Sequence, residues 1–204
     1  MQESLIEKFG NIDIYVFDQL LKGNIAKTHR ILDAGCGGGR NHYYLAKNNF
    51  NLSAFDIDEE RLRMAKEQAT LLGYNHTDKF VQGNMVAIPF KDESFDWIIN
   101  VAVLHFAEEK SHFEQMLNEL WRVLAKGGKL LIRVARNIGI AHFMQPLRNN
   151  RFVMPDGSER FVLDEKDFDF YTKKLDAIQF EPLKTTNVSN LRCMTTWCLQ
   201  KPVG

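Results

Sequence analysis

A glycine-rich turn with an acid just before it is the stretch of this sequence best suited to chemistry. Residues 31–40 read Ile-Leu-Asp-Ala-Gly-Cys-Gly-Gly-Gly-Arg, which indicates a short buried strand, a glycine turn and the start of a helix near Gly39. The four glycines allow positive φ angles and leave no side chains between the main chain and a ligand. A helix start directs free N–H groups at the same place and favours a carboxylate or phosphate there. Asp33 would lie at the edge of this pocket, where an acid can hold a cationic amine or a hydroxyl.

Two acids follow the next apolar segment, at the distance where nucleoside-binding sheets place a carboxylate. Residues 52–55 read as a second strand, and Asp56, Ile57 and Asp58 come directly after it. An acid at this strand end binds ribose hydroxyls in such sheets, so we expect Asp56 to contact a ligand, with Ile57 beside it. Asp58 suits the N-cap of the helix that follows. The two acids could also exchange these roles.

The glycine turn resembles the D-x-G-x-G-x-G motif of class I methyltransferases, which use S-adenosylmethionine (SAM). The four fixed places of the motif are filled by Asp33, Gly35, Gly37 and Gly39. Cys36 lies within the motif, and the resemblance implies that it also lines the cofactor. The dinucleotide fingerprint G-x-G-x-x-G fits less well, because its third glycine falls on Arg40 or His42. SAM has a carboxylate for the helix start and an ammonium group for Asp33. A strand–helix turn without a ligand is the alternative.

The resemblance continues along the chain. In the family, a polar and an apolar residue after the third strand line the adenine of SAM, and Asn84 and Met85 match these types. The apolar run Phe95–Val101 is typical of a strand buried on both faces in a parallel sheet. It is similar to the family's F-D-x-apolar-apolar strand. The resemblance implies that Asn100 and Val101, at the end of this strand, also lie at the cofactor.

His105 is the candidate catalytic residue. The sequence Val-Leu-His at 103–105 is similar to the family's V-L-H-H, with Phe106 in the last place. Imidazole changes its charge near neutral pH, so His105 could act as a base or orient the acceptor. A histidine that is only hydrogen-bonded within the core is the alternative. Arg133 and Arg136, near the end of a predicted fifth strand, could bind an acidic acceptor.

The order of the predicted elements supplies a scaffold for these residues. Strands and helices alternate up to the fifth strand, which predicts a doubly wound α/β sheet with right-handed crossovers. Its ligand crevice lies at the carboxyl ends of the strands, where the candidate residues meet. Residues Leu183–Val188 and Cys193–Leu199 then read as a terminal antiparallel strand pair. The resemblance implies a Rossmann-like, mostly parallel seven-stranded sheet with one inserted antiparallel strand.

We expect one methyltransferase domain over residues 1–204, with two additions. Residues 1–25 read as an N-terminal helical cap, with a helix over Asn11–Lys22 that either packs on the sheet or covers the pocket. In the second case Tyr15 or Gln19 would touch substrate. Residues 137–163 read as a loop or hairpin inserted after the fifth strand, because Pro-Asp-Gly at 155–157 is a turn signal. Capping patterns begin at Ser111, where a Glu follows three residues later, and at Asp164.

Composition narrows the classes of function. Lys plus Arg and Asp plus Glu each number 26 among 204 residues, so the formal net charge is zero and gives no general attraction to nucleic acid or anionic membrane. The N-terminus lacks a signal-peptide apolar segment, and the longest apolar run is too short to span a bilayer. The three cysteines lack metal-ligand spacing. We therefore expect a cytoplasmic protein without a metal site. A homodimer is a possible assembly.

The resemblance implies transfer of a methyl group from SAM to an acceptor by in-line displacement, with S-adenosylhomocysteine (SAH) as the product. The D/N/S-P-P-Y/F signature of amino-methylating enzymes would start at Asn100, but Val-Ala-Val follows. The neutral charge also disfavours a polyanionic substrate. We therefore expect a small-molecule acceptor. Residues 39–41 and 44–45 are also similar to the tellurite-resistance methyltransferases.

Two other classes of protein stay open at this point. A non-catalytic SAM-binding regulator would share every cofactor residue. An NAD-dependent oxidoreductase would share the sheet and Asp56, although the third glycine of its fingerprint is missing.

Overall fold

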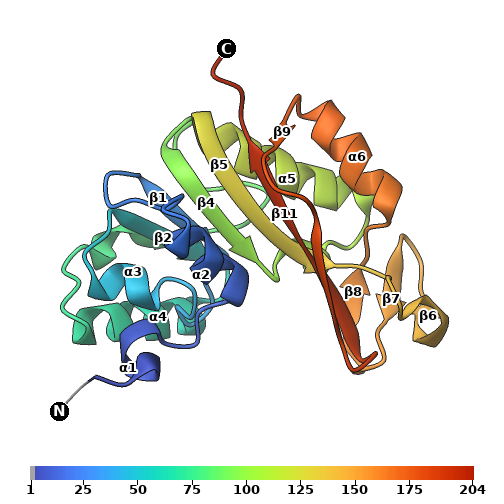
Figure 1. The fold of residues 1–204 in the computed structure, drawn as a ribbon, viewed down its shortest axis with the longest axis horizontal. Helices are drawn as coiled ribbons and strands as arrows, with labels where there is room; N and C mark the ends of the chain where they lie inside the picture. Colours follow the sequence, from blue (N-terminus) through green and yellow to red (C-terminus); the bar gives the residue numbers. More distant parts are fainter. Residues whose placement is uncertain (1–2) are drawn as a thin grey trace.

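The structure, a computed structural model, describes residues 3–204 and is built around one twisted mixed sheet (Figure 1). Its main strands lie in the order β10-β11-β5-β4-β1-β2-β3, and a short β9 pairs with β11. The strand bounds are β1 Ile31–Ala34, β2 Leu52–Asp56, β3 Phe80–Gln82, β4 Phe95–Val101, β5 Leu124–Ala135, β9 Ile178–Gln179, β10 Lys184–Val188 and β11 Arg192–Gln200.

Strand direction confirms the predicted doubly wound sheet. Strands β1 to β5 pair in parallel with their neighbours. The last strand, β11, lies between β5 and β10 and is antiparallel to both. The predicted terminal pair is therefore present, and its second member provides the inserted antiparallel strand. The strand order reverses between β1 and β4, which is where an open sheet of this kind forms its ligand crevice.

Helices cover both faces of the sheet (Figure 1). On one face α5 and α6 pack against strand residues that include Ile98 and Ile132. On the other face α2, α3 and α4 pack against Trp97, Ile99 and other strand residues. Neighbouring residues of β4 thus point to opposite cores, as the alternation of a strand requires. The helix bounds are α1 Leu5–Phe9, α2 Ile14–Leu21, α3 Tyr43–Lys47, α4 Glu59–Leu71, α5 Lys110–Val123 and α6 Glu165–Lys174.

Two predicted helix caps are confirmed and one is wrong. Asp58 caps α4 by accepting a hydrogen bond from the Arg61 amide at 3.1 Å. Asp164 caps α6 and forms a reciprocal capping box with Asp167. The predicted box at Ser111 does not form, because α5 already begins at Lys110 and the Ser111 hydroxyl donates to the Glu109 carboxylate instead.

Helix boundaries also differ from the predicted ones. The segment 11–22 is helical only from Ile14, because Asp13 caps the helix by accepting from the Tyr15 amide. The helix after the glycine turn begins at Tyr43 rather than near Gly39, since the positive φ of Gly39 is incompatible with a helix. Helix α5 ends at Val123, and the chain enters β5 directly.

The segment after β5 folds into a small separate sheet. It holds β6 Gln145–Pro146, β7 Arg151–Val153 and β8 Glu159–Phe161, which pair antiparallel. We call residues 145–161 the flap. A small core that includes Ala135, Met154 and Cys193 packs the flap region against the end of β5 and the start of β11. In Figure 1 the flap lies beyond the ends of these two strands. Within residues 3–204, no helix has the length and apolar character needed to cross a bilayer.

Candidate functional site

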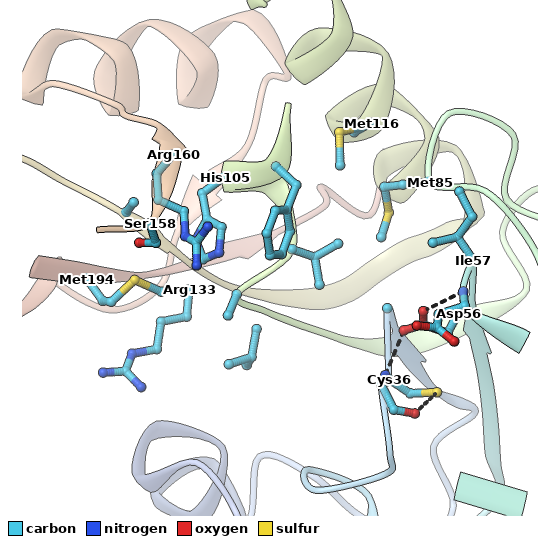
Figure 2. A pocket seen from close by; sticks show the side chains of 18 of the residues that line it. Cys36, Asp56, Ile57, Met85, His105, Met116, Arg133, Ser158, Arg160 and Met194 are labelled. Carbon is cyan, nitrogen blue, oxygen red and sulfur yellow. Dashed lines mark hydrogen bonds between the residues drawn. The ribbon is translucent and has the colours of Figure 1, made fainter. Parts of the chain in front are cut away.

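A cavity of about 950 Å³ opens at the carboxyl ends of the parallel strands. Its volume lies in the upper part of the range typical of small-molecule sites. One part of its wall, the glycine side, is formed by the turn after β1 and the ends of β2 and β3. The opposite part, the flap side, is formed by β8, the turn before it and the start of β11. Figure 2 shows Cys36, Asp56 and Met85 on the first side and His105, Arg160 and Met194 on the second.

The fold brings nine of the sequence-predicted residues together in the lining of this cavity. They come from four separate stretches of the chain, each at a strand end. They are Gly35, Cys36, Gly37, Asp56, Ile57, Asn84, Met85, Val101 and His105.

Hydrogen bonds to β2 fix the shape of the glycine turn. The amides of Gly35 and Cys36 both donate to the Phe55 carbonyl at 3.0 Å. The Gly37 amide donates to Asp56 Oδ2 at 2.7 Å, and the Asp58 amide donates to Asp56 Oδ1 at 3.0 Å. Each carboxylate oxygen of Asp56 keeps a further lone pair that can accept a hydrogen bond. The turn therefore presents main chain and a fixed negative charge to the cavity.

The Cys36 thiol belongs to the lining but is not a nucleophile. Burial raises its pKa far above the ordinary value, and the nearby carboxylates of Asp33 and Asp56 raise it further. Nucleophilic cysteine chemistry needs the thiolate. Cys36 therefore contributes shape and apolar contact to the cavity wall.

Three predicted cofactor residues lie just outside the lining and support the turn. Asp33 is buried, with its Oδ2 atom 2.9 Å from Nδ1 of the buried His42 ring. Gly39 packs so closely on this ring that a Cβ atom would lie 2.6 Å from His42 Nε2. Asn100 donates from Nδ2 to the Ala34 carbonyl at 3.0 Å. Asp33 Oδ2 is thus paired with His42, while Oδ1 has no hydrogen-bond partner among residues 3–204, and the contact of Asp33 with an amine of the ligand stays a prediction.

Of the four predicted substrate residues, Arg133 lies in the cavity lining and the other three lie outside it. The Tyr15 hydroxyl is 2.7 Å from Thr186 Oγ1, and Gln19 donates to Glu181 at 3.0 Å. Arg136 is buried against the Phe168 ring, with its guanidinium carbon 5.1 Å from the ring centroid. These positions follow from how the N-terminal helices pack on β10 and how α6 packs on β5. Neither packing contact could be predicted from neighbouring residues in the sequence.

His105 lies on the short 3-10 helix Leu104–Phe106 and is almost fully buried, with 4% of its surface exposed. Its Nδ1 atom has no hydrogen-bond partner among residues 3–204. Burial lowers the pKa of the imidazole to about 3, and the positive charge of Arg160 lowers it further. His105 is therefore neutral at physiological pH and offers a hydrogen bond rather than a charge to the cavity.

His105 should make the protein less stable in weak acid. Because the folded pKa is about 3 and the unfolded value about 6.5, only the unfolded chain binds this proton between these pH values. We expect this residue to cost roughly 2 kcal/mol of unfolding free energy between pH 7 and pH 5. Urea unfolding of wild type and His105→Gln at both pH values measures the difference. His76→Gln, an exposed histidine, is the control, and equal pH slopes for wild type and His105→Gln would contradict the expectation.

Sequence reasoning missed the flap side of the cavity. Its lining comes from the flap and from β11, in a region read only as an inserted hairpin and a terminal strand. The turn signal at 155–157 indicated that the chain folds back there, but no local pattern indicated where the hairpin packs. The residues missed include Met154, Asp156, Ser158, Arg160, Arg192 and Met194.

Comparison with known proteins agrees with this geometry. Residues 32–132, close to half of the chain, match a family model described as a methyltransferase domain. The chain is 31% identical over 109 residues to a fatty-acid O-methyltransferase of Mycolicibacterium smegmatis, an alignment covering 52% of this chain and 37% of that protein. It is 32% identical over 101 residues to the phthiotriol/phenolphthiotriol dimycocerosates methyltransferase of Mycobacterium tuberculosis, covering 48% and 35%. The chain thus spans less than half the length of these curated relatives.

Solved structures share the fold over nearly the whole chain. A SAM-dependent methyltransferase from Methanosarcina mazei superposes with a TM-score of 0.75 at 20% identity, covering 91% of this chain and 98% of that one. The magnesium protoporphyrin IX methyltransferase of Synechocystis PCC 6803, solved with bound SAH, gives 0.71 at 17% identity, covering 98% and 89%. The family match, the sheet order and the glycine turn together identify this chain as carrying a class I SAM-dependent methyltransferase domain.

Proposed function

We propose that the protein transfers a methyl group from SAM to a small-molecule acceptor. One observation carries the proposal: the glycine turn and the fixed Asp56 carboxylate form one side of a cavity whose other side is free for a second molecule. The names of the relatives support a small acceptor, since they act on a fatty acid and on phthiotriol or phenolphthiotriol dimycocerosates. We also propose a cytoplasmic location and a homodimer, and one domain over 1–204 with additions at 1–25 and 137–163.

The residues of the glycine side fit SAM. A Cβ atom on Gly38 would meet no atom within 4 Å. The main chain at Gly38 therefore borders the open cavity directly, and a larger side chain there would occupy space for a ligand. Asp56 can accept hydrogen bonds from the two ribose hydroxyls. Met85 is buried in the wall and Ile57 is 64% exposed, so the two can pack on a flat ring. Asn84 offers amide groups beside them.

The protein's task in this reaction is positioning. When bound, SAM supplies a methyl group already activated on its sulfonium. Asp56 and the glycine turn would fix one reactant, and the flap side would hold the other in line with it, which is worth several kcal/mol of the barrier. The apolar side chains of Met116, Met154 and Met194 line the cavity and would keep water from the reacting atoms once both molecules are bound. Neutral His105 could orient the acceptor by a hydrogen bond.

Calorimetric titration with SAM, SAH and NAD in turn tests the proposal. We expect micromolar binding of SAM and SAH and none of NAD, followed by methylation of acceptors from a small-molecule panel with radiolabelled SAM. Binding of NAD alone would overturn the proposal in favour of hydride chemistry. Binding of SAM with no turnover on any acceptor class would favour a SAM-binding regulator.

A further inference from the structure

Arg160 is a positively charged side chain in the cavity wall that has no acidic partner among residues 3–204. It lies on β8, and Figure 2 shows it beside His105 on the flap side. Its guanidinium carbon lies 4.8 Å from the centroid of the Phe106 ring, and Nη1 donates to the Glu159 carbonyl at 2.8 Å. Within residues 3–204 the guanidinium makes no ion pair, and burial lowers its pKa. Arginine nevertheless stays protonated in proteins, so a charge is held here at a cost.

Several other arginines of the chain are neutralised by carboxylates. Arg122 pairs with Glu119 at 2.7 Å, and Arg30 pairs with Asp96 at 2.7 Å. Arg133 also lines the cavity, but it is ion-paired with the buried Asp13. Arg160 is therefore the guanidinium of the cavity wall that is both partly buried and available to a ligand.

The charges around Arg160 leave one positive charge in excess on the flap side. Asp156 accepts hydrogen bonds from the Ser158 amide, at 3.0 Å, and from the Ser158 hydroxyl, so its own turn already binds it. Arg192, exposed at the start of β11, adds a second cation to the lining. The hydrogen bonds from Ser158 lower the pKa of the Asp156 carboxyl, and the positive charges of Arg160 and Arg192 lower it further. A single acid therefore faces two cations, which suits a ligand group with one negative charge.

The remaining wall of the flap side is largely apolar. Met154 and Cys193 are buried there, and Met194 and Phe106 complete the surface around the guanidinium. A doubly charged phosphate would lose more hydration here than one excess positive charge can replace. A carboxylate on an apolar body matches the charge, the planar fork of the guanidinium and the surrounding surface.

We infer that the flap side binds the methyl acceptor through a carboxylate group held by the Arg160 guanidinium, with the apolar part of the acceptor against Met154 and Met194. His105 lines the same wall as a neutral side chain and adds no charge beside Arg160. This inference rests on the proposed function, because it names the class of acceptor for that reaction.

The test uses three probes that differ only in the head group on a pentyl chain: hexanoate, hexanamide and pentylphosphonate. Each is titrated by calorimetry into the protein with and without saturating SAH. In wild type we expect hexanoate to bind at least tenfold more tightly than hexanamide, as a charge-assisted hydrogen bond to arginine implies. Arg160→Gln should abolish this preference, and Arg160→Lys should keep part of it.

Arg148→Gln is the matched control, because Arg148 is an exposed residue of the flap and lies outside the cavity lining. It should keep the full preference for hexanoate, and SAH affinity should change less than twofold in every variant. The inference is overturned if wild type does not prefer hexanoate, if Arg160→Gln keeps the preference, or if pentylphosphonate binds more tightly than hexanoate. Failure to bind SAH would instead contradict the proposed function, while the titrations without SAH would still report on Arg160.

Discussion

Replacing Asp56 with alanine is expected to weaken SAH binding about 100-fold or more. The carboxylate is held by the amides of Gly37 and Asp58, at 2.7 and 3.0 Å, and lines the glycine side of the cavity. Its loss removes the proposed hydrogen bonds from two ligand hydroxyls. Each is worth roughly 1.5–3 kcal/mol, because the carboxylate that accepts them is charged. Calorimetric titration of wild type and Asp56→Ala with SAH measures the change.

Two further variants separate ligand contact from support of the turn. Glu59→Ala removes an exposed carboxylate three positions along the chain that is not in the lining, and it should leave SAH affinity unchanged. Asp56→Asn keeps one oxygen for the Gly37 amide but loses the charge, so its affinity should fall between those of wild type and Asp56→Ala. Binding of SAH to Asp56→Ala within threefold of wild type would show that the carboxylate is not a ligand contact.

Strands and helix caps that depend only on residues close together in the chain were predicted correctly. The run 95–101 reads as a fully buried strand because both of its faces are covered by helices, and β4 has these bounds. Asp58 and Asp164 start their helices because a side chain three residues before an amide can bond to it locally. The predicted cap at Ser111 is wrong because the helix begins one residue earlier, at Lys110. Ser111 therefore lies inside the first turn of the helix and cannot cap it.

The candidate site also has a part that local sequence predicts and a part that depends on distant packing. The glycine side was predictable, because strand ends in a parallel sheet converge and the turn carries its own chemistry. The pairing of Asp33 with His42 was not predictable, because it depends on how the turn folds back, which spacing does not show. Arg160 was not found at all, since it reaches the cavity only through packing of the flap against β5 and β11.

Replacing Gly35 with alanine is expected to lower the free energy of unfolding by roughly 2–4 kcal/mol. Gly35 has φ +75°, a conformation that costs other residues about 1–2 kcal/mol. A Cβ atom would also lie 2.6 Å from Val103 Cγ2, inside van der Waals contact, and overpacking of this kind costs about 1–3 kcal/mol. Urea unfolding at pH 7 measures the loss.

Two further variants separate the backbone strain from the overpacking in the stability lost by Gly35→Ala. Gly38→Ala lies three residues away, where an added Cβ meets no atom within 4 Å and φ is not positive, so it should be nearly neutral for stability. Val103→Ala removes the atoms that the new Cβ would meet. The double variant should therefore be more stable than the two single changes predict together, by about the overpacking part of the cost. What persists in the double variant is the backbone strain of the turn. If Gly35→Ala proved as stable as Gly38→Ala, neither the positive φ nor the contact with Val103 would constrain the turn that forms the glycine side.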